Sequence, residues 1–118
     1  MPITVAAVAT KQESGGALAH VFGKVVTSTD AAAGNVSLGF EPSLLIVFNY
    51  SNPSMHVYAK GMTAAYMMYL ATGGTFSVVT SAALTLYAGD ATHAAGFTYG
   101  TDATLNTAGD VLYYIAFR

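Results

Sequence analysis

From Leu18 onward the sequence consists of short apolar runs separated by turn-forming residues, and this pattern constrains the fold more than any other feature. The runs are rich in β-branched and aromatic residues, while Gly, Asn, Asp and Ser stand between them. Such runs, bounded by such residues, are typical of the strands of a β-sandwich or barrel. The sequence therefore predicts an all-β fold, an antiparallel β-sandwich or jelly-roll-like barrel.

The turn-forming residues between the runs indicate where the strands end and the chain reverses. Gly73-Gly74 lies between two apolar runs and suits a hairpin turn with positive φ, and Asn52-Pro53 marks another reversal. A helix over residues 62–70 stays open as an alternative, because Ala, Met and Leu favour helices. The predicted strands lie near residues 18–27, 35–40, 44–50, 55–60, 65–71, 75–80, 83–88, 96–99 and 111–117.

Two of these runs, residues 44–48 and 111–117, are apolar at both parities. Successive side chains of a strand point to opposite faces of the sheet, so a strand with one face in water should alternate. We therefore expect both strands to be covered on both faces, one by the core and the other by something else. A second subunit is one candidate.

The charge content supports that expectation. Only 8% of the 118 residues are charged, against roughly 25% in an ordinary soluble domain, and 53% are apolar. A chain of this size leaves about a third of its surface exposed. Either Ser, Thr, Asn and Gly cover that surface, or neighbouring subunits do, as in the more apolar obligate interfaces. We expect a homo-oligomer.

Several classes of partner and site are disfavoured. The net charge is −2 and the four basic residues are scattered, so no basic cluster is available for nucleic acid. The chain has no Cys, which excludes disulfides and thiolate metal sites. Residues 61–89 carry no charge and are long enough to span a bilayer, but Gly73-Gly74 and many Ser and Thr residues interrupt them. We expect no membrane span.

Residues 1–17 form an expected N-terminal arm, and residues 18–118 a single β domain. The arm combines small apolar residues with a polar joint that contains Gly15-Gly16. Such an arm can reach a neighbouring subunit, although a frayed terminus is an equal alternative.

No residue constellation points to catalysis. His20, His56 and His93 lie far apart and lack the close spacing of a metal site. The carboxylates lie mostly in predicted turns, where a short acidic side chain caps backbone N–H groups. A glycosidase pair made of Asp90 and Asp102 is not excluded, but nothing favours it. We expect no enzyme activity, no metal and no cofactor.

Three weaker motifs each have a competing explanation. Residues 96–100 have the glycine spacing of a nucleophile elbow with Thr in the place of Ser, and they also fit an aromatic strand. Residues 102–110 superficially suggest calcium but lack the alternating oxygen ligands and closing Glu of an EF-hand. Exposed Tyr50, Tyr58 or Tyr99 near loops would suit glycan binding.

Two longer segments carry a resemblance. Residues 39–49, Gly-Phe-Glu-Pro-Ser followed by an apolar strand that ends in Asn49, resemble a stretch of small β modules in tailed-bacteriophage virion proteins. Residues 96–106 followed by 111–117 are similar to the C-terminal stretch of the same modules. The two segments together cover about half of the chain.

This resemblance implies a structural virion protein. Such modules occur in capsid decoration (cement) proteins and in tail-fibre or baseplate proteins. The short chain resembles a stand-alone cement protein, a class that is often trimeric. Such a protein is assembled in the host cytoplasm and stabilises the head from the capsid surface. The alternative is a tail-fibre or baseplate module that binds a host receptor or glycan.

The expected partners are further copies of the chain and the major capsid protein. In this interpretation Ile3, Val5 and Val8 belong to the shell-binding arm, which adds a strand to an exposed sheet edge. Tyr113 and Phe117 are the expected subunit contacts. Each of these residues can equally be ordinary core.

Overall fold

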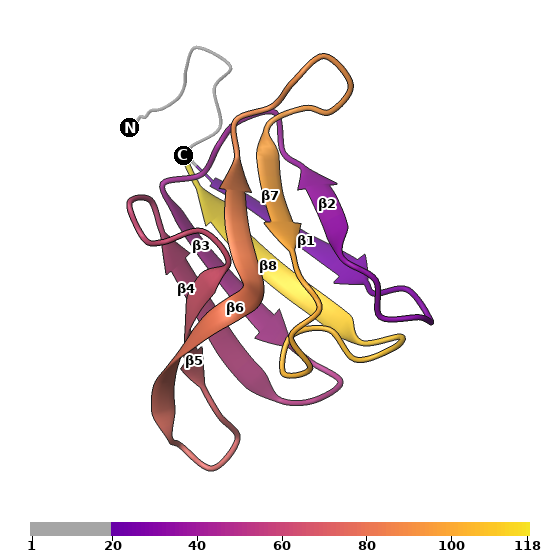
Figure 1. Cartoon of the computed structure of the whole chain (residues 1–118), viewed down its shortest axis with the longest axis vertical. Coiled ribbons are helices and arrows are strands. Elements are labelled where there is room, and N and C mark those ends of the chain that lie inside the picture. Colours follow the sequence, from indigo (N-terminus) through magenta and orange to yellow (C-terminus); the bar gives the residue numbers. More distant parts are fainter. Residues whose placement is uncertain (1–19) are drawn as a thin grey trace, which may run out of the picture.

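A computed structural model describes residues 20–118, which form eight β-strands (Figure 1). The fold is all-β, as the sequence predicts, with 52% of the described residues in strands. The strands are β1 (His20–Val26), β2 (Gly34–Ser37), β3 (Leu44–Asn49), β4 (Ser54–Ala59), β5 (Tyr66–Leu70), β6 (Phe76–Tyr87), β7 (Gly96–Tyr99) and β8 (Val111–Phe117).

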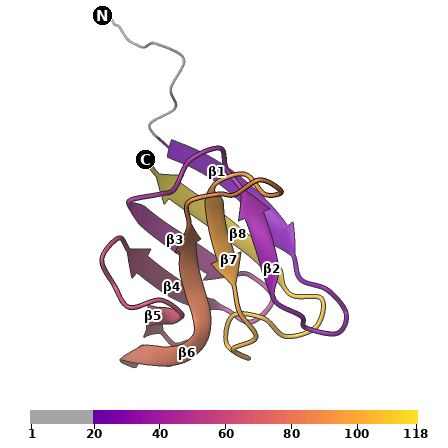
Figure 2. The ribbon, with the colours of Figure 1, turned by 45° about the horizontal axis from the view of Figure 1, so that its top comes forward.

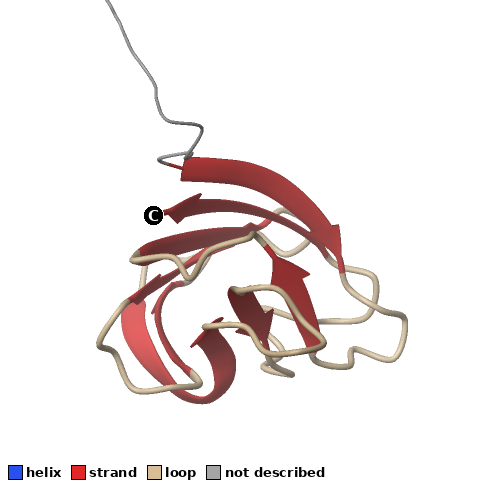
Figure 3. Ribbon diagram, turned by 90° about the horizontal axis from the view of Figure 1, so that it is seen from above, coloured by secondary structure: helices blue, strands red, loops and turns tan. Residues whose placement is uncertain are grey.

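All pairings are antiparallel, in the order β1-β8-β3-β4-β5-β6-β7-β2. The long strand β6 connects two layers. Its first half pairs with β5, its second half pairs with β7, and the register shifts between them. Ala82 lies at this irregularity with φ 55°, a left-handed conformation that bends the strand. The layers are therefore β1-β8-β3-β4-β5 with the first half of β6, and the second half of β6 with β7 and β2 (Figures 1 and 3).

This geometry corrects one detail of the predicted strands. The runs 75–80 and 83–88 are not two strands separated by a turn but the two halves of β6. The helix alternative over residues 62–70 is wrong, since β5 occupies Tyr66–Leu70. The predicted hairpin turn is confirmed: Gly74 has φ 88°, and the amide of Ala71 donates a hydrogen bond to the carbonyl of Thr75.

The core lies between the two layers. In β3 and β8 every second side chain is buried, including Leu45 and Val47 in β3 and Leu112 and Tyr114 in β8. Phe97 of β7 packs edge-on against Tyr114, with ring centroids 5.3 Å apart, and so joins the layers. The inner parity of both doubly apolar runs thus faces the core, as expected.

A glycine in each edge strand makes room for a tyrosine opposite it. Gly23 of β1 pairs with Tyr114, and a Cβ at Gly23 would overlap the Tyr114 ring. Gly34 of β2 has the same relation to Tyr99. The aromatic rings lie over the glycines, so any side chain there must displace a core tyrosine.

The irregular loop between β7 and β8 is fixed by buried polar side chains. Asn49 donates from Nδ2 to Oδ2 of Asp110 at 2.8 Å and to the carbonyl of Thr104 at 3.2 Å. Asn106 donates to the carbonyls of Ala32 and Gly100, and Thr27 donates to the carbonyl of Thr107. These bonds replace the sheet pairing that the loop lacks. Among the described residues, the Oδ1 of Asn106 is buried without a hydrogen-bond partner.

The two segments that carry the family resemblance have structural roles here. Gly39, with φ 86°, makes the turn that leads into β3, and Phe40 is buried beneath the guanidinium of Arg118 at 5.2 Å. The C-terminal end of β8 lies beside the start of β1, where His20 pairs with Phe117 (Figure 2). Asn49, the last residue of β3, clamps the β7–β8 loop. The resemblance therefore covers turn, clamp and strand positions.

Candidate interaction surface

The outward side of the larger layer is an apolar surface, which we call the outer face. It consists of the side chains of β1, β8, β3, β4, β5 and the first half of β6 that point away from the core. One row of register-paired residues crosses all of these strands: Phe22, Ile115, Ile46, Val57, Met68 and Val78.

A second row runs parallel to the first: Lys24, Tyr113, Phe48, Met55, Leu70 and Phe76. A third row is shorter: His20, Phe117, Leu44 and Ala59. Apart from His20 and Lys24, every member of the three rows is apolar. An antiparallel sheet with one solvated face would carry polar residues at these positions.

The large apolar side chains that are exposed within residues 20–118 gather on or beside this face. They are Phe22, Val26, Phe48, Tyr50, Phe76, Val78 and Phe117. Phe22 is 65% exposed, Phe76 is 59% exposed, and these two lie on opposite flanks of the layer. Exposed hydrophobic residues are normal when scattered, but contiguous ones mark an interaction surface.

The size of the outer face can be compared with that of a protein interface. Six strands spaced about 4.8 Å apart span about 24 Å along the sheet, and the three rows, set two residues apart, extend about 13 Å along the strands, which gives an area of about 300 Å² between row centres. The side chains add relief, so the accessible area is larger. A stable interface takes about 800 Å² from each partner. The apolar rows thus supply a part, but not all, of the area that such an interface takes.

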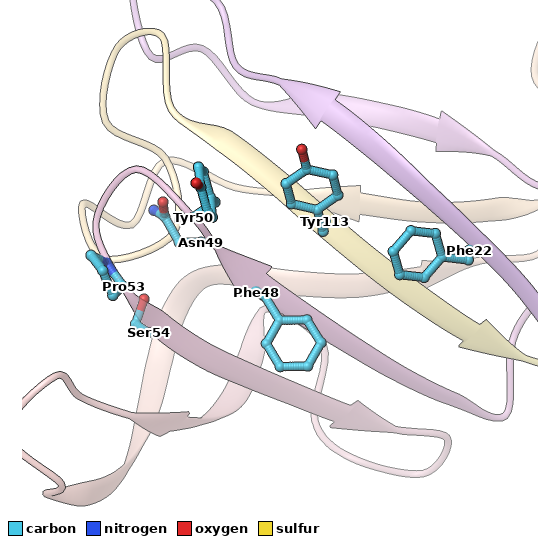
Figure 4. Close-up of a pocket in the computed structure, with 7 residues that line it drawn as sticks. All are labelled: Phe22, Phe48, Asn49, Tyr50, Pro53, Ser54 and Tyr113. Carbon is cyan, nitrogen blue, oxygen red and sulfur yellow. The ribbon is translucent and has the colours of Figure 1, made fainter.

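A groove indents the face near the β3–β4 turn (Figure 4). Its volume is about 610 Å³, and its lining comprises Phe22, Phe48, Asn49, Tyr50, Pro53, Ser54 and Tyr113. The Phe22 and Tyr113 rings stack with centroids 6.3 Å apart, and Tyr50 meets Tyr113 edge-on at 5.9 Å. These aromatic walls are apolar and held in place by one another, which suits them to receive an apolar side chain.

The opposite side of the molecule is different. In the smaller layer, Asn35, Thr98 and Thr85 form the outward row across β2, β7 and β6. Hydroxyl and amide groups of this kind are ordinary at a solvated surface. Within residues 20–118 the two outward surfaces therefore have opposite character: one carries polar side chains and the other carries apolar side chains.

The residues expected at a subunit contact lie on the apolar side. Tyr113 belongs to the second row and lines the groove, and Phe117, 36% exposed, belongs to the third row. The expected arm residues Ile3, Val5 and Val8 lie outside the described residues. The contact hypothesis itself stays a prediction.

The sequence reasoning missed most of the outer face. The sequence does not single out four of its members: Phe22, Val57, Met68 and Val78. Each is one apolar residue in its strand, and the face of the sheet on which it lies depends on how that strand pairs with the adjacent strands. The sequence does show that β3 and β8, which form the middle of the face, are apolar at alternate positions on both sides of the strand. Extending it to the other strands requires the register.

The glycan hypothesis needs a correction. Tyr58 and Tyr99 are not exposed near loops but buried, at 4% and 7% exposure, with inward-pointing rings. The Tyr58 hydroxyl donates to the carbonyl of Met62 at 2.7 Å. Tyr50 alone of the three is available to a ligand, at 73% exposure.

The candidate carboxylate pair is separated by the fold. Asp90 lies in the loop before β7 and Asp102 in the loop after it, so the two flank opposite ends of a strand. Each caps its own turn: Asp90 accepts from the amides of Thr92 and His93, and Asp102 accepts from the amide of Thr104. The Tyr87 hydroxyl, and after it the amides of Thr92 and His93, donate to the Asp90 carboxylate and hold its pKa well below the ordinary value. Neither carboxylate lines the groove of the outer face.

The remaining motifs also have structural explanations. Thr98, at the position of an elbow serine, lies mid-strand in β7 between Asn35 and Thr85. His56 is fully buried and stacks on Tyr69 at 5.3 Å, and burial lowers its pKa. Across residues 20–118 there is no group of three or more His, Asp or Glu side chains placed to hold a metal ion. The same residues contain no helix long and apolar enough to cross a membrane.

No protein-family model matches this chain, and neither a curated protein nor a solved structure matches it.

Proposed function

We propose that this protein is a structural component of a tailed-phage virion, a capsid decoration protein that binds the head as a homo-oligomer. The observation that supports a structural role is the contrast between the two outward surfaces. Burying the apolar rows against protein gains about 25 cal/mol per Å² removed from water. The low charge content agrees with a chain whose working state is an assembly.

The assignment to a virion, and to the head in particular, comes from the resemblance of residues 39–49 and 96–117. In this proposal the arm with Ile3, Val5 and Val8 binds the major capsid protein by adding a strand to an exposed sheet edge. Several linked arms then bind more tightly than one, because each further contact is intramolecular. The role is mechanical and uses no cofactor and no catalytic residue.

The test is cosedimentation with undecorated phage heads. We expect the full chain to pellet with heads and a variant lacking residues 1–10 to stay in the supernatant. Circular dichroism checks that the truncated variant keeps its β-sheet spectrum. Loss of head binding on changing Thr98→Lys, on the polar face, while the truncation still binds, would show that the arm is not the attachment point. A full chain that never pellets would contradict the head assignment.

A second candidate function is a tail-fibre or baseplate tip that binds a receptor or glycan. The observation in its favour is the exposed Tyr50 beside the groove, since aromatic faces pack well against apolar faces of ligands. It requires saturable binding to host cells that Tyr50→Ala abolishes and Tyr66→Ala leaves unchanged.

A further inference from the structure

We propose that Thr104 and Asp102 form a relay behind the buried ring of His56, through which the folded protein takes up one proton in mild acid. The proposal goes beyond the structural role and does not depend on it, because it concerns the interior of a single chain. His56 lies on β4 at 0% exposure. Within residues 20–118 the other two histidines, His20 and His93, are exposed.

The ring of His56 is held at one face and at both nitrogen atoms. The face stacks on the ring of Tyr69 from β5, with centroids 5.3 Å apart and the planes inclined by 16°. Nδ1 lies 3.3 Å from the carbonyl oxygen of Val47 on β3. Nε2 lies 3.5 Å from Oγ1 of Thr104, in the loop between β7 and β8. Both ring nitrogens are therefore aimed at oxygen atoms of other elements.

Both of these oxygen atoms are acceptors. A backbone carbonyl has no hydrogen to donate, so Nδ1 carries the proton in its bond to Val47. The hydroxyl of Thr104 is engaged elsewhere, because it donates to Oδ1 of Asp102 in a closer contact. In the neutral ring Nε2 thus faces an oxygen that offers it no hydrogen, and the long separation of 3.5 Å fits this arrangement.

A proton on Nε2 completes this network. The imidazolium then donates from Nδ1 to the carbonyl of Val47 and from Nε2 to Oγ1 of Thr104. The Thr104 hydroxyl keeps its own bond to Asp102, so the added positive charge and the carboxylate are joined through one hydroxyl. Hydrogen bonds to ionised groups are stronger than neutral ones. The charged ring therefore gains bonds without breaking any that the neutral ring makes.

The relay is in place before the proton arrives. The amide of Thr104 donates to Oδ1 of Asp102 at 2.9 Å. The carbonyl of Thr104 accepts from Nδ2 of Asn49 at 3.2 Å and from Oγ of Ser54 at 3.4 Å. Ser54 and His56 are two residues apart on β4 and so point to the same face of the sheet. Thr104 is thus fixed against β4 through both its backbone and its hydroxyl.

The relay also joins the buried ring to the surface. Thr104 and Asp102 are half-buried, and Ala103 between them is exposed. Solvent therefore reaches the relay from the loop side, and a proton can arrive there without separation of the strands.

The groups that face the ring come from three elements. β3 contributes the carbonyl of Val47, β5 contributes Tyr69, and the loop after β7 contributes Asp102, which is the charged group that acts on the ring. The loop's other carboxylate, Asp110, accepts instead from Asn49 and from the amide of Thr107. Asp102 is therefore the counter-charge of the relay.

Two opposing effects set the pKa of His56. Burial lowers the pKa and is the largest cause, while the carbonyl of Val47, the charge of Asp102 and the backbone of Thr104 raise it. A histidine whose folded pKa lies below its ordinary value loses stability as the pH falls through that value, and the loss stops at the folded pKa. Because the relay raises the folded pKa, it limits the loss of stability in acid.

NMR spectra of the His56 ring, recorded on the full chain against pH, test the relay. The exposed rings of His20 and His93 serve as references in the same spectra. We expect the neutral His56 ring to carry its proton on Nδ1 and to gain the second on Nε2 in acid. The backbone amide signals of β3 and β4 should keep their dispersion through this step.

Two variants separate the parts of the relay. Thr104→Val removes the hydroxyl with little change of shape, and Asp102→Asn removes the charge but keeps an acceptor oxygen. Each should lower the pKa of His56 by about one pH unit. Thr104→Ser, which keeps a hydroxyl, should leave the pKa at its original value, and so should the control Thr98→Val on the polar face.

Three results would overturn the relay. They are a neutral ring that carries its proton on Nε2, a pKa that either relay variant leaves unchanged while its circular dichroism is that of the folded protein, and an original chain that unfolds before His56 takes up the proton. If Thr104→Val does not fold, the comparison of Asp102→Asn with Thr104→Ser decides. Because each readout concerns one ring in one chain, a failed relay leaves the proposed virion role standing, and a chain that never pellets with heads leaves the relay standing.

Discussion

Changing Asn49 to Asp should strongly destabilise the fold at neutral pH, although the two side chains have nearly the same shape. Asn49 is 1% exposed and its Nδ2 lies 2.8 Å from Oδ2 of Asp110. The substitution replaces this hydrogen bond by two facing carboxylates. It also replaces the donor to the carbonyl of Thr104, which lies 3.2 Å from Nδ2, by a carboxylate oxygen that cannot donate.

The magnitude follows from the separation of the two charges. Two unit charges about 4 Å apart repel by about 4 kcal/mol at an effective dielectric constant near 20. The lost hydrogen bond adds about 1 kcal/mol. A domain of this kind is stable by only about 5–15 kcal/mol, so Asn49→Asp should lose a third or more of its free energy of unfolding.

Urea unfolding followed by circular dichroism measures the effect at pH 7 and pH 4. At low pH the pair can share a proton, which removes the repulsion, so the deficit relative to the unmodified protein should shrink. Asn35→Asp, on the exposed strand β2, is the matched control and should stay within about 0.5 kcal/mol. An Asn49→Asp protein as stable as the original at pH 7 would refute the clamp, and a deficit equal at both pH values would refute its electrostatic origin.

Two further predictions concern buried positions. Gly23→Ala should cost about 1–3 kcal/mol, because the new methyl group overlaps the Tyr114 ring, whereas Gly73→Ala has open space and should be nearly neutral; equal urea midpoints for the two variants would contradict this. Burial lowers the pKa of His56 below its ordinary 6.5, so between that value and the lowered folded pKa the unfolded state binds the proton and the folded state does not. The contribution of His56 to the free energy of unfolding is therefore fully present above pH 6.5. It decreases as the pH falls below 6.5, by up to about 1.4 kcal/mol per pH unit. His56→Phe should flatten this slope, and an unchanged slope would assign the pH dependence to other groups.

The sequence was sufficient to predict the fold class and most strands, because turn residues and β-rich runs are local signals. It also predicted that one parity of β3 and β8 faces the core, since parity within one strand can be read without knowing its neighbours; what covers the other parity stays a prediction. The merging of two runs into β6 was not predictable, because the break at Ala82 looks like a turn until the register with β5 and β7 is known.

The candidate site was harder to predict for a related reason. An outward row such as Phe22–Ile46–Val57 consists of residues from strands that are distant in sequence, and only the register shows that they share a face. The buried bonds of Asn49 and Asn106 likewise join positions far apart in the chain. Tyr58 and Tyr99 lie close to turns, and their burial depends on cross-strand packing that sequence proximity does not reveal.

The solution mass of the purified full chain, measured by multi-angle light scattering, tests the central claim most directly. One chain weighs 12.1 kDa, and an outer face covered by further copies of the chain requires a particle of at least twice that mass. Val57→Lys, at the centre of the face, should reduce the mass to that of a monomer, and Thr98→Lys, on the polar face, should leave it unchanged. A monomeric full chain at micromolar concentration would contradict the account, because the apolar rows would then be stable in water without a partner copy.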